Sequence, residues 1–178
     1  MLITIDPHTI KFPEFFTIPV HVLSATSLFA REIGRDIKNT PFSLVSPDSG
    51  GIRMIGPLSE IFHHASIVTI SKDRFPDGSV EATDIEGKVE KVCVIVDDII
   101  ATGSTIKEAV KILKKNGASE FYIFATHAVL SQNSKNNLSD SAIKKIFVSN
   151  SLQYEKKEYP FITMLPTTEL LINHLDQS

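Results

Sequence analysis

Residues 92–105 read VCVIVDDIIATGST, and this stretch decides the fold class. Its first five residues, Val92–Val96, are apolar without alternation, which predicts a strand buried on both faces in a parallel sheet. Two adjacent carboxylates, Asp97 and Asp98, follow at the expected end of the strand, and a hydroxyl-rich turn comes next. Apolar residues at i, i+4 and i+7 from Ile106 then predict a helix.

The turn has the composition of a phosphate-binding loop. In open α/β sheets, ligands bind at the carboxyl ends of strands, where N–H groups at helix starts attract phosphate. Gly103 would let the backbone approach closely, and the hydroxyls of residues 102–105 add donors. Because acids beside a phosphate loop repel the anion, Asp97 and Asp98 are expected to hold ribose hydroxyls or a divalent cation. The predicted ligand is a sugar phosphate with magnesium, and the alternative is an ordinary βα turn with an acidic N-cap.

Length and composition favour one cytoplasmic domain spanning residues 1–178. The chain carries a net charge of −3, with acids and bases interspersed, so neither a nucleic-acid footprint nor a basic membrane patch is expected. The only cysteine, Cys93, lies in the predicted buried strand, which favours a reducing compartment and a core role over a catalytic thiol. Met1–Asp6 lacks the features of a signal peptide, and no segment approaches the roughly 20 apolar residues of a membrane span.

Strands and helices are predicted to alternate along the chain. Besides residues 92–96, strands are expected at 2–5, 42–45, 67–70, 80–85, 121–125, 145–148 and 161–164. Helices are expected at 24–37, from the end of the 46–51 loop to about Phe62, from about 106 to 115, and at 167–175. Pro57 implies a kink or a later start of the second helix. Residues 12–20 are expected to form a packed connection, and residues 72–79 a mobile loop or hairpin tip. The predicted fold is α/β, with a central, mostly parallel sheet flanked by helices.

Three further loops follow predicted strands and would meet at the same edge of the sheet. SPDSGG, residues 46–51, has adjacent glycines whose N–H groups suit diphosphate and an acid, Asp48, that suits the accompanying cation, although a plain tight turn explains it equally well. Asp6–His8 follows the first strand, where a histidine is more often a surface or hydrogen-bonded residue than a ligand. Lys72–Arg74 resembles a solvated turn in isolation, but cations on a flexible loop can close over charge during phosphoryl transfer.

Taken together, these segments resemble the ribose-phosphate pyrophosphokinases, or PRPP synthetases, which have the type I phosphoribosyltransferase fold. Residues 92–105 resemble the PRPP-binding motif of that fold. Residues 3–20 resemble the family's strand-D-x-H segment with its aromatic connection, and residues 46–51 resemble its S-P-D-x-G-G loop. Residues 72–74 resemble its K-x-R motif, and residues 125–131 (ATHAVLS) resemble its A-T-H-x-x-x-S stretch. The resemblance covers nearly the whole chain, but family members are longer and consist of two similar domains, of which this chain corresponds to the C-terminal one.

The resemblance implies a role for each matching residue. Lys72 matches the catalytic lysine, and Arg74 matches a second catalytic basic residue that contacts ribose 5-phosphate. Asp97 and Asp98 match the acids that hold ribose hydroxyls directly or through metal. The loop that grips the 5-phosphate is matched by Ala101, Thr102, Gly103, Ser104 and Thr105. The loop for diphosphate and the ATP phosphates is matched by Asp48, Ser49, Gly50 and Gly51, and the Mg2+ site by His8 and Asp48. Many relatives have Asp where this chain has Ala101, a change that a main-chain contact tolerates.

The implied reaction moves the diphosphoryl group of ATP to the 1-hydroxyl of ribose 5-phosphate, giving PRPP and AMP. Such a transfer depends on positioning and on neutralising phosphoryl charge, which Mg2+, Lys72 and Arg74 would supply. Because the family's N-terminal domain supplies much of the adenine site, ATP binding and activity are expected to need a missing half or a partner. The family also implies a homo-oligomer, a dimer or higher. The alternatives are a phosphoribosyltransferase that consumes PRPP, for which no base-recognising hood is visible, and a non-catalytic PRPP or ribose 5-phosphate sensor, which would not need Lys72 and Arg74.

Overall fold

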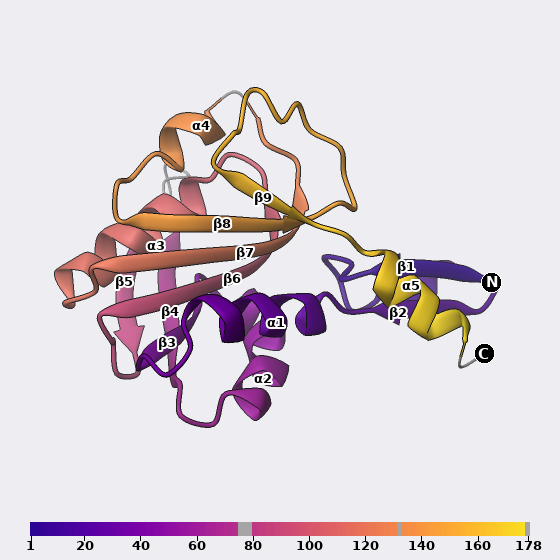
Figure 1. Cartoon of the computed structure of the whole chain (residues 1–178), viewed down its shortest axis with the longest axis horizontal. Helices are drawn as coiled ribbons and strands as arrows, with labels where there is room; N and C mark the ends of the chain where they lie inside the picture. Colours follow the sequence, from indigo (N-terminus) through magenta and orange to yellow (C-terminus); the bar gives the residue numbers. More distant parts are fainter. Residues whose placement is uncertain (75–79, 132, 177–178) are drawn as a thin grey trace.

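The main sheet is seven-stranded, with the order β5-β4-β3-β6-β7-β8-β9 (Figure 1). The computed structural model describes residues 1–74, 80–131 and 133–176, and within them the side chains other than those of Ser49 and residues 72–83. The strands are β3 (Phe42–Ser46), β4 (Ser66–Arg74), β5 (Val80–Glu86), β6 (Val92–Ile100), β7 (Glu120–Ala128), β8 (Ile143–Ser149) and β9 (Ile162–Leu165). All neighbours are parallel except β4 and β5. The predicted α/β fold with a mostly parallel sheet is confirmed.

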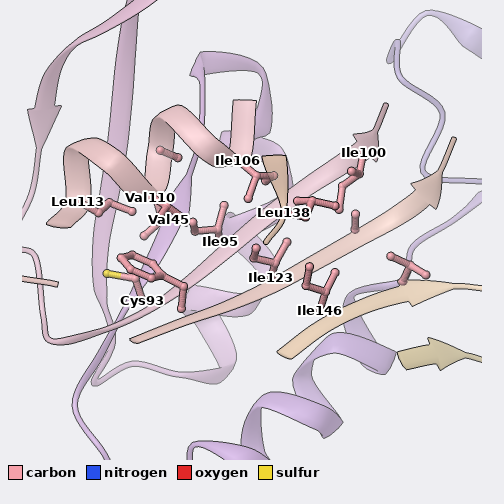
Figure 2. Close-up of a cluster of buried hydrophobic side chains, with 14 of the residues drawn as sticks. Val45, Cys93, Ile95, Ile100, Ile106, Val110, Leu113, Ile123, Leu138 and Ile146 are labelled. Atoms are coloured by element: carbon pink, nitrogen blue, oxygen red, sulfur yellow. The ribbon is translucent and has the colours of Figure 1, made fainter. Parts of the chain in front are cut away.

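Helices cover both faces of this sheet. On one face α1 (Thr26–Asp36) and α2 (Ile52–Ile61) pack against Val92, Val94 and Val96 of β6. On the other face α3 (Ser104–Lys115) places Ile106, Val110 and Leu113 over Cys93 and Ile95, as Figure 2 shows. The short helix α4 (Ser134–Asn137) follows β7. β6 is therefore buried on both faces, as its unbroken apolar run predicts, because alternate residues of one strand serve the two halves of the core.

A second, smaller sheet lies apart from the main one. β1 (Leu2–Ile5) pairs in parallel with β2 (Val20–Leu23), and the C-terminal helix α5 (Thr168–Leu175) lies beside them (Figure 1). The rings of His21 in β2 and His174 in α5 are 4.7 Å apart between centroids. The 3-10 helix η1 (Phe12–Phe15) connects the two strands, and none of its residues is buried. The prediction of a packed connection at residues 12–20 is therefore wrong, because residues 14–19 are exposed and the other three are only half-buried.

Several element ends differ from the sequence prediction for identifiable reasons. β6 continues through the two acids to Ile100, because β7 is equally long and pairs with it as far as Ala128. The 3-10 helix η2 (Ser49–Gly51) leads directly into α2, and Pro57 lies inside that helix. Of the two predicted alternatives, a kink or a later start, the later start is therefore excluded. β4 extends through Lys72 and Arg74, where β5 pairs with it, while residues 75–79 of the predicted loop lie outside the described residues. Within those residues, no helix combines the length and apolarity that crossing a bilayer requires.

Candidate active site

The predicted site segments meet at one edge of the main sheet. β3 lies between β4 and β6 and is parallel to both, so their carboxyl ends point the same way. β3 leads into the loop 46–51, β6 carries Asp97 and Asp98 and leads into 101–105, and β4 carries Lys72 and Arg74 in its last residues. A Cβ on Gly51 would lie 3.6 Å from the carbonyl oxygen of Val96, an ordinary van der Waals contact, so the first loop packs directly on β6.

The loop 46–51 is closed by its own carboxylate. Asp48 Oδ1 accepts hydrogen bonds from the N–H groups of Gly50 (3.0 Å) and Gly51 (3.1 Å), and the buried Ser46 Oγ donates to Asp48 O (2.5 Å). A Cβ at residue 51 would lie 2.6 Å from Ser46 Oγ, so a larger residue would have to move this hydroxyl away from its hydrogen bond to Asp48 O. The expectation that these N–H groups stand open is wrong for this conformation. An incoming diphosphate would have to displace the Asp48 carboxylate from them.

Asp98 is the centre of a charged cluster. Asp98 is a buried residue, and its Oδ2 accepts from Arg53 Nη2 of α2 (2.6 Å) and from His8 Nδ1 (3.0 Å). Arg53 also donates to His8 O (3.3 Å). His8 is thus placed against the acid of β6, whereas the resemblance grouped it with Asp48. Sequence reasoning missed Arg53. The available signal was a cation in the first turn of the helix that follows the glycine loop.

Asp97 and Asp98 face different environments. Successive side chains of a strand point to opposite faces, so Asp97 points away from the Arg53 side. Both residues are buried, and Asp97 Oδ1 accepts from the Asp98 N–H (2.9 Å). The two acids can therefore act on different parts of one ligand lying across the end of β6.

The loop 101–105 has the geometry of an anion site. Gly103 precedes α3 with φ +71°, a left-handed conformation that glycine adopts without strain. The hydroxyls of Thr102 and Ser104 are 2.8 Å apart, and the Ser104 N–H donates to Thr102 Oγ1 (3.2 Å). The first N–H groups of a helix lack acceptors within the helix and carry the positive end of its dipole. Phosphate would be bound there by main-chain donors, with the two hydroxyls beside them.

Helix α4 supports this loop from behind, which the sequence did not indicate. Asn137 Nδ2 donates to Thr102 O (2.9 Å), and Lys107 Nζ donates to Asn137 Oδ1 (3.3 Å). A Cβ on Gly103 would lie 3.1 Å from Leu138 Cγ, so Leu138 packs directly against the loop. A helix of one turn gives too little periodicity to be recognised in a sequence.

The small sheet is fastened to the main sheet at the same edge. Asp6, at the end of β1, is buried and accepts from Thr126 Oγ1 of β7 (2.7 Å) and from the Ala25 N–H before α1 (2.8 Å). His127 Nε2 faces the carbonyl oxygens of Ile5 (3.0 Å) and Asp6 (3.2 Å), so it carries the proton and donates. These bonds place His8, two residues after Asp6, over Asp98. The segments 3–20 and 125–131 are thus in contact.

The carboxylates at this edge are better suited to a magnesium ion that is already bound to a polyphosphate than to an ion bound by protein ligands alone. Among the residues described, no three or more His, Cys, Asp or Glu side chains lie together in a way that could hold a metal ion. Mg2+ commonly takes one or two carboxylates and completes its shell with water and phosphate oxygens. Asp48, Asp97 and Asp98 are carboxylates at this edge that a nucleotide-bound ion could use. Lys72 and Arg74 are placed here only by the backbone of β4.

Comparison with known proteins agrees with this architecture. Residues 20–159 match the family model described as phosphoribosyl transferase domain. A ribose-phosphate pyrophosphokinase of Mycobacterium leprae is 33% identical over 175 residues, which are 96% of this chain and 53% of that protein. One of Staphylococcus epidermidis is 36% identical over 162 residues, 89% of this chain and 50% of that protein. The chain therefore spans about half the length of the curated relatives that it matches.

Solved structures extend the comparison to the fold. The phosphoribosylpyrophosphate synthetase from Mycobacterium smegmatis matches with a TM-score of 0.85 and 31% identity, covering 98% of this chain and 57% of that one. Orotate phosphoribosyltransferase from Aeropyrum pernix matches with a TM-score of 0.56 at 16% identity over 86% of this chain and 75% of that one, a likeness of fold alone. Since the family model covers most of its residues, the chain belongs to the phosphoribosyl transferase domain family.

Proposed function

We propose that the chain is the C-terminal, catalytic half of a ribose-phosphate pyrophosphokinase. It would transfer diphosphate from ATP to the 1-hydroxyl of ribose 5-phosphate, giving PRPP and AMP. The observation that carries the proposal is that the loops 46–51 and 101–105 follow adjacent parallel strands, β3 and β6, with the acids of β6 between them. One loop suits a diphosphate, the other a monophosphate, and the acids suit the sugar that joins them.

The ribose 5-phosphate half of the site is proposed to lie at the end of β6. The 5-phosphate would bind the main chain of Ala101–Thr105, with added donors from the hydroxyls of Thr102 and Ser104. Asp97 and Asp98 would accept hydrogen bonds from the ribose hydroxyls or share a metal ion with them. Support comes from the left-handed Gly103 and from the burial of both acids, which limits competition from water.

The polyphosphate half is proposed to lie over η2 and the start of α2. Rotation of Asp48 toward Mg2+ would release the N–H groups of Gly50 and Gly51 for the diphosphate, with Ser49 beside them. His8 would reach the same ion from the other side. When bound, Mg2+ supplies neutralisation of charge on the transferring oxygens. Lys72 and Arg74 would add positive charge from the end of β4, and the step needs no covalent nucleophile.

We propose further that residues 1–178 form a single phosphoribosyltransferase-like domain that acts with a second half. The support is that the relatives are about twice as long as the matched region. That half, on the same subunit or another, would complete the adenine site in a homo-oligomer. Substrates would then be small molecules, without nucleic acid or membrane. A cytoplasmic location stays a prediction that rests on the buried, unpaired Cys93.

Binding tests the site without requiring turnover. Calorimetric titration with ribose 5-phosphate should show that Asp97→Asn and Gly103→Val each weaken binding by about tenfold or more. Lys72→Ala should leave it unchanged, because Lys72 serves the transfer and not this ligand. The exposed Lys91→Ala is a matched control. Equal losses in all three site variants would contradict this division of roles.

Turnover tests the reaction. Incubation with ATP, Mg2+ and ribose 5-phosphate, with the N-terminal half of a relative added in a parallel sample, should yield AMP. Lys72→Ala should lower the rate by about a hundredfold or more, as loss of a charge at a transferring phosphoryl group does. Ribose 5-phosphate binding without any AMP would favour a sensor. PRPP consumption that depends on an added nucleobase would favour a phosphoribosyltransferase.

A further inference from the structure

A cavity of about 390 Å³ lies beside the start of β8, away from the carboxyl edge. Its walls come from α4, the α4–β8 connection, the first residues of β8 and the residue before β9. The volume lies in the range of about 300–1,000 Å³ typical of small-molecule sites. None of the proposed ligand-binding residues lines this cavity, and the contact between the two places is Leu138, which packs against Gly103.

The floor of the cavity is apolar. Leu138 and Ile146 are 3% and 1% exposed, and Figure 2 shows both in the cluster beneath α3. Ile143 adds to this floor, and Phe161 stands at the wall with 38% of its surface exposed. A ligand body that covered these side chains would remove apolar surface from water, which favours binding by about 25 cal/mol per Å².

The charge at the rim is positive. Lys135 and Lys144 line the cavity, and in the described part of the chain neither makes an ion pair. The acid at the rim, Asp140, is neutralised by Lys114, whose Nζ is 2.6 Å from Oδ1. The hydrogen bond from Lys114 lowers the pKa of the Asp140 carboxyl, so this ion pair is present at neutral pH. Two uncompensated cations over an apolar floor suit an anion with an apolar body.

The wall of the cavity is also the support of the phosphate loop. Leu138 lines the cavity and packs against Gly103. The residue before it, Asn137, donates to Thr102 O. Lys107 fixes the same asparagine from the first turn of α3. A molecule bound against Leu138 would therefore restrain residues 137 and 138, which in turn hold residues 102 and 103 in place.

We propose that this cavity is a second ligand site, which takes a small organic anion with an apolar body, and that occupancy stiffens the phosphate loop. The existence of the site is independent of the proposed function, whereas its regulatory meaning rests on it. By linkage, a ligand that favours the ordered loop would strengthen phosphate binding, and phosphate would strengthen the ligand's binding equally.

The probe for the site is 8-anilinonaphthalene-1-sulfonate, an aromatic body with one negative charge. Titration of the full chain should give saturable fluorescence with one dominant site. Lys144→Glu and Phe161→Ala should each weaken this site by about fivefold or more, through lost charge and lost apolar contact respectively. Lys91→Glu, an exposed lysine elsewhere, and Phe15→Ala, in the exposed 3-10 helix, should leave it unchanged. Dye affinity that is insensitive to both cavity variants and falls in Phe15→Ala would overturn the proposal.

Hydrogen–deuterium exchange of the native chain tests the coupling without any substrate. Saturating dye should slow exchange of amides 102–107, and the effect should vanish in Phe161→Ala at the same dye concentration. Exchange of the first turn of α1 serves as an internal reference. A fully occupied cavity with unchanged exchange at 102–107 would contradict the coupling. Failure of ribose 5-phosphate to bind would count against the proposed function and leave both of these readouts intact.

Discussion

Burial of Cys93 makes its thiol harder to ionise. Cys93 is the second residue of β6 and has no exposed surface, and burial raises the pKa of its thiol to about 12. A thiol ionises by losing a proton, so a pKa above the unfolded value means that the folded state disfavours the thiolate. The structure therefore confirms the sequence prediction that Cys93 is a core residue.

We expect Cys93 to be inert toward thiol reagents in the folded protein near about pH 8, where only an unfolded chain offers appreciable thiolate. Ellman's reagent should react only as the chain unfolds, and at once in denaturant. The free energy of unfolding should fall as pH rises from about 9, the unfolded pKa, toward about 12, because the unfolded state then loses a proton that the folded state keeps. Urea titrations compared with Cys93→Ala isolate this contribution, and identical pH profiles would contradict it.

Arg53 is a residue whose importance only the structure reveals. It donates to Asp98 at 2.6 Å and to the His8 carbonyl at 3.3 Å, so it orients a proposed ribose-binding acid. Arg53→Met should weaken ribose 5-phosphate by about tenfold, the effect of losing one charged hydrogen bond. Arg53→Lys should be intermediate, since lysine keeps the charge but loses the planar fork. Calorimetry checks both variants against Lys91→Met, and native affinity in Arg53→Met would show that Asp98 needs no such support.

At the level of secondary-structure elements, the contact between the phosphate loop and Leu138 makes residue 103 less tolerant of a side chain than an ordinary glycine in a turn. Gly103 and Gly117 both have positive φ, at +71° and +98°, but only Gly103 has a side chain within reach of a new Cβ. Both Gly→Ala variants should lose about 1 kcal/mol of unfolding free energy from backbone strain. Only Gly103→Ala should also weaken ribose 5-phosphate, because it displaces the loop from Leu138. Adding Leu138→Ala to Gly103→Ala should recover part of that affinity, and no recovery would exclude the contact as the cause.

The bond between Asp6 and Thr126 joins the two sheets. Both side chains are buried, with their oxygens 2.7 Å apart, and Asp6 also accepts from the Ala25 N–H. Asp6→Ala should cost about 2–4 kcal/mol of unfolding free energy, because two buried donors lose their acceptor. Thr126→Val should cost less, and the double variant should cost less than the sum. Urea denaturation measures this cycle, and strict additivity would mean that the two side chains do not act together.

Element prediction from the sequence succeeded where one physical signal was strong. The apolar run of Val92–Val96 and the helical spacing after Ile106 specify β6 and α3 without outside information. The end of β6 was missed because pairing with β7, a distant segment, extends it. β2 was missed because His21 interrupts its short apolar run, and α4 because a single turn carries too little pattern. For the site, the sequence correctly predicted that the motif segments meet at one edge of the sheet. It could not predict the cluster of His8, Arg53 and Asp98, because this cluster depends on contacts between three segments far apart in sequence.

At the scale of the whole molecule, apolar surface is concentrated around the crossover from β1 to β2. Ile10 and Phe15 are 79% and 73% exposed, and Ile18 and Val22 are about half exposed. Exposed apolar side chains that gather in one segment can mark an interaction site in a folded protein. The crossover lies beside the small sheet, away from α3 and α4 (Figure 1). A partner could therefore cover it without touching the cavity beneath α4.

We expect this surface to mediate the association proposed above. Sedimentation velocity at micromolar concentrations should show self-association of the chain, because burying Phe15 removes apolar area that the isolated chain leaves in water. Phe15→Glu should shift the distribution toward monomer by placing an unpaired charge in the contact. Ile61→Glu, an equally apolar and 53% exposed position at the end of α2, should leave it unchanged. Both variants should retain native ribose 5-phosphate affinity, since neither lies at the carboxyl edge. Association that survives Phe15→Glu but is lost in Ile61→Glu would move the interface to the opposite part of the molecule.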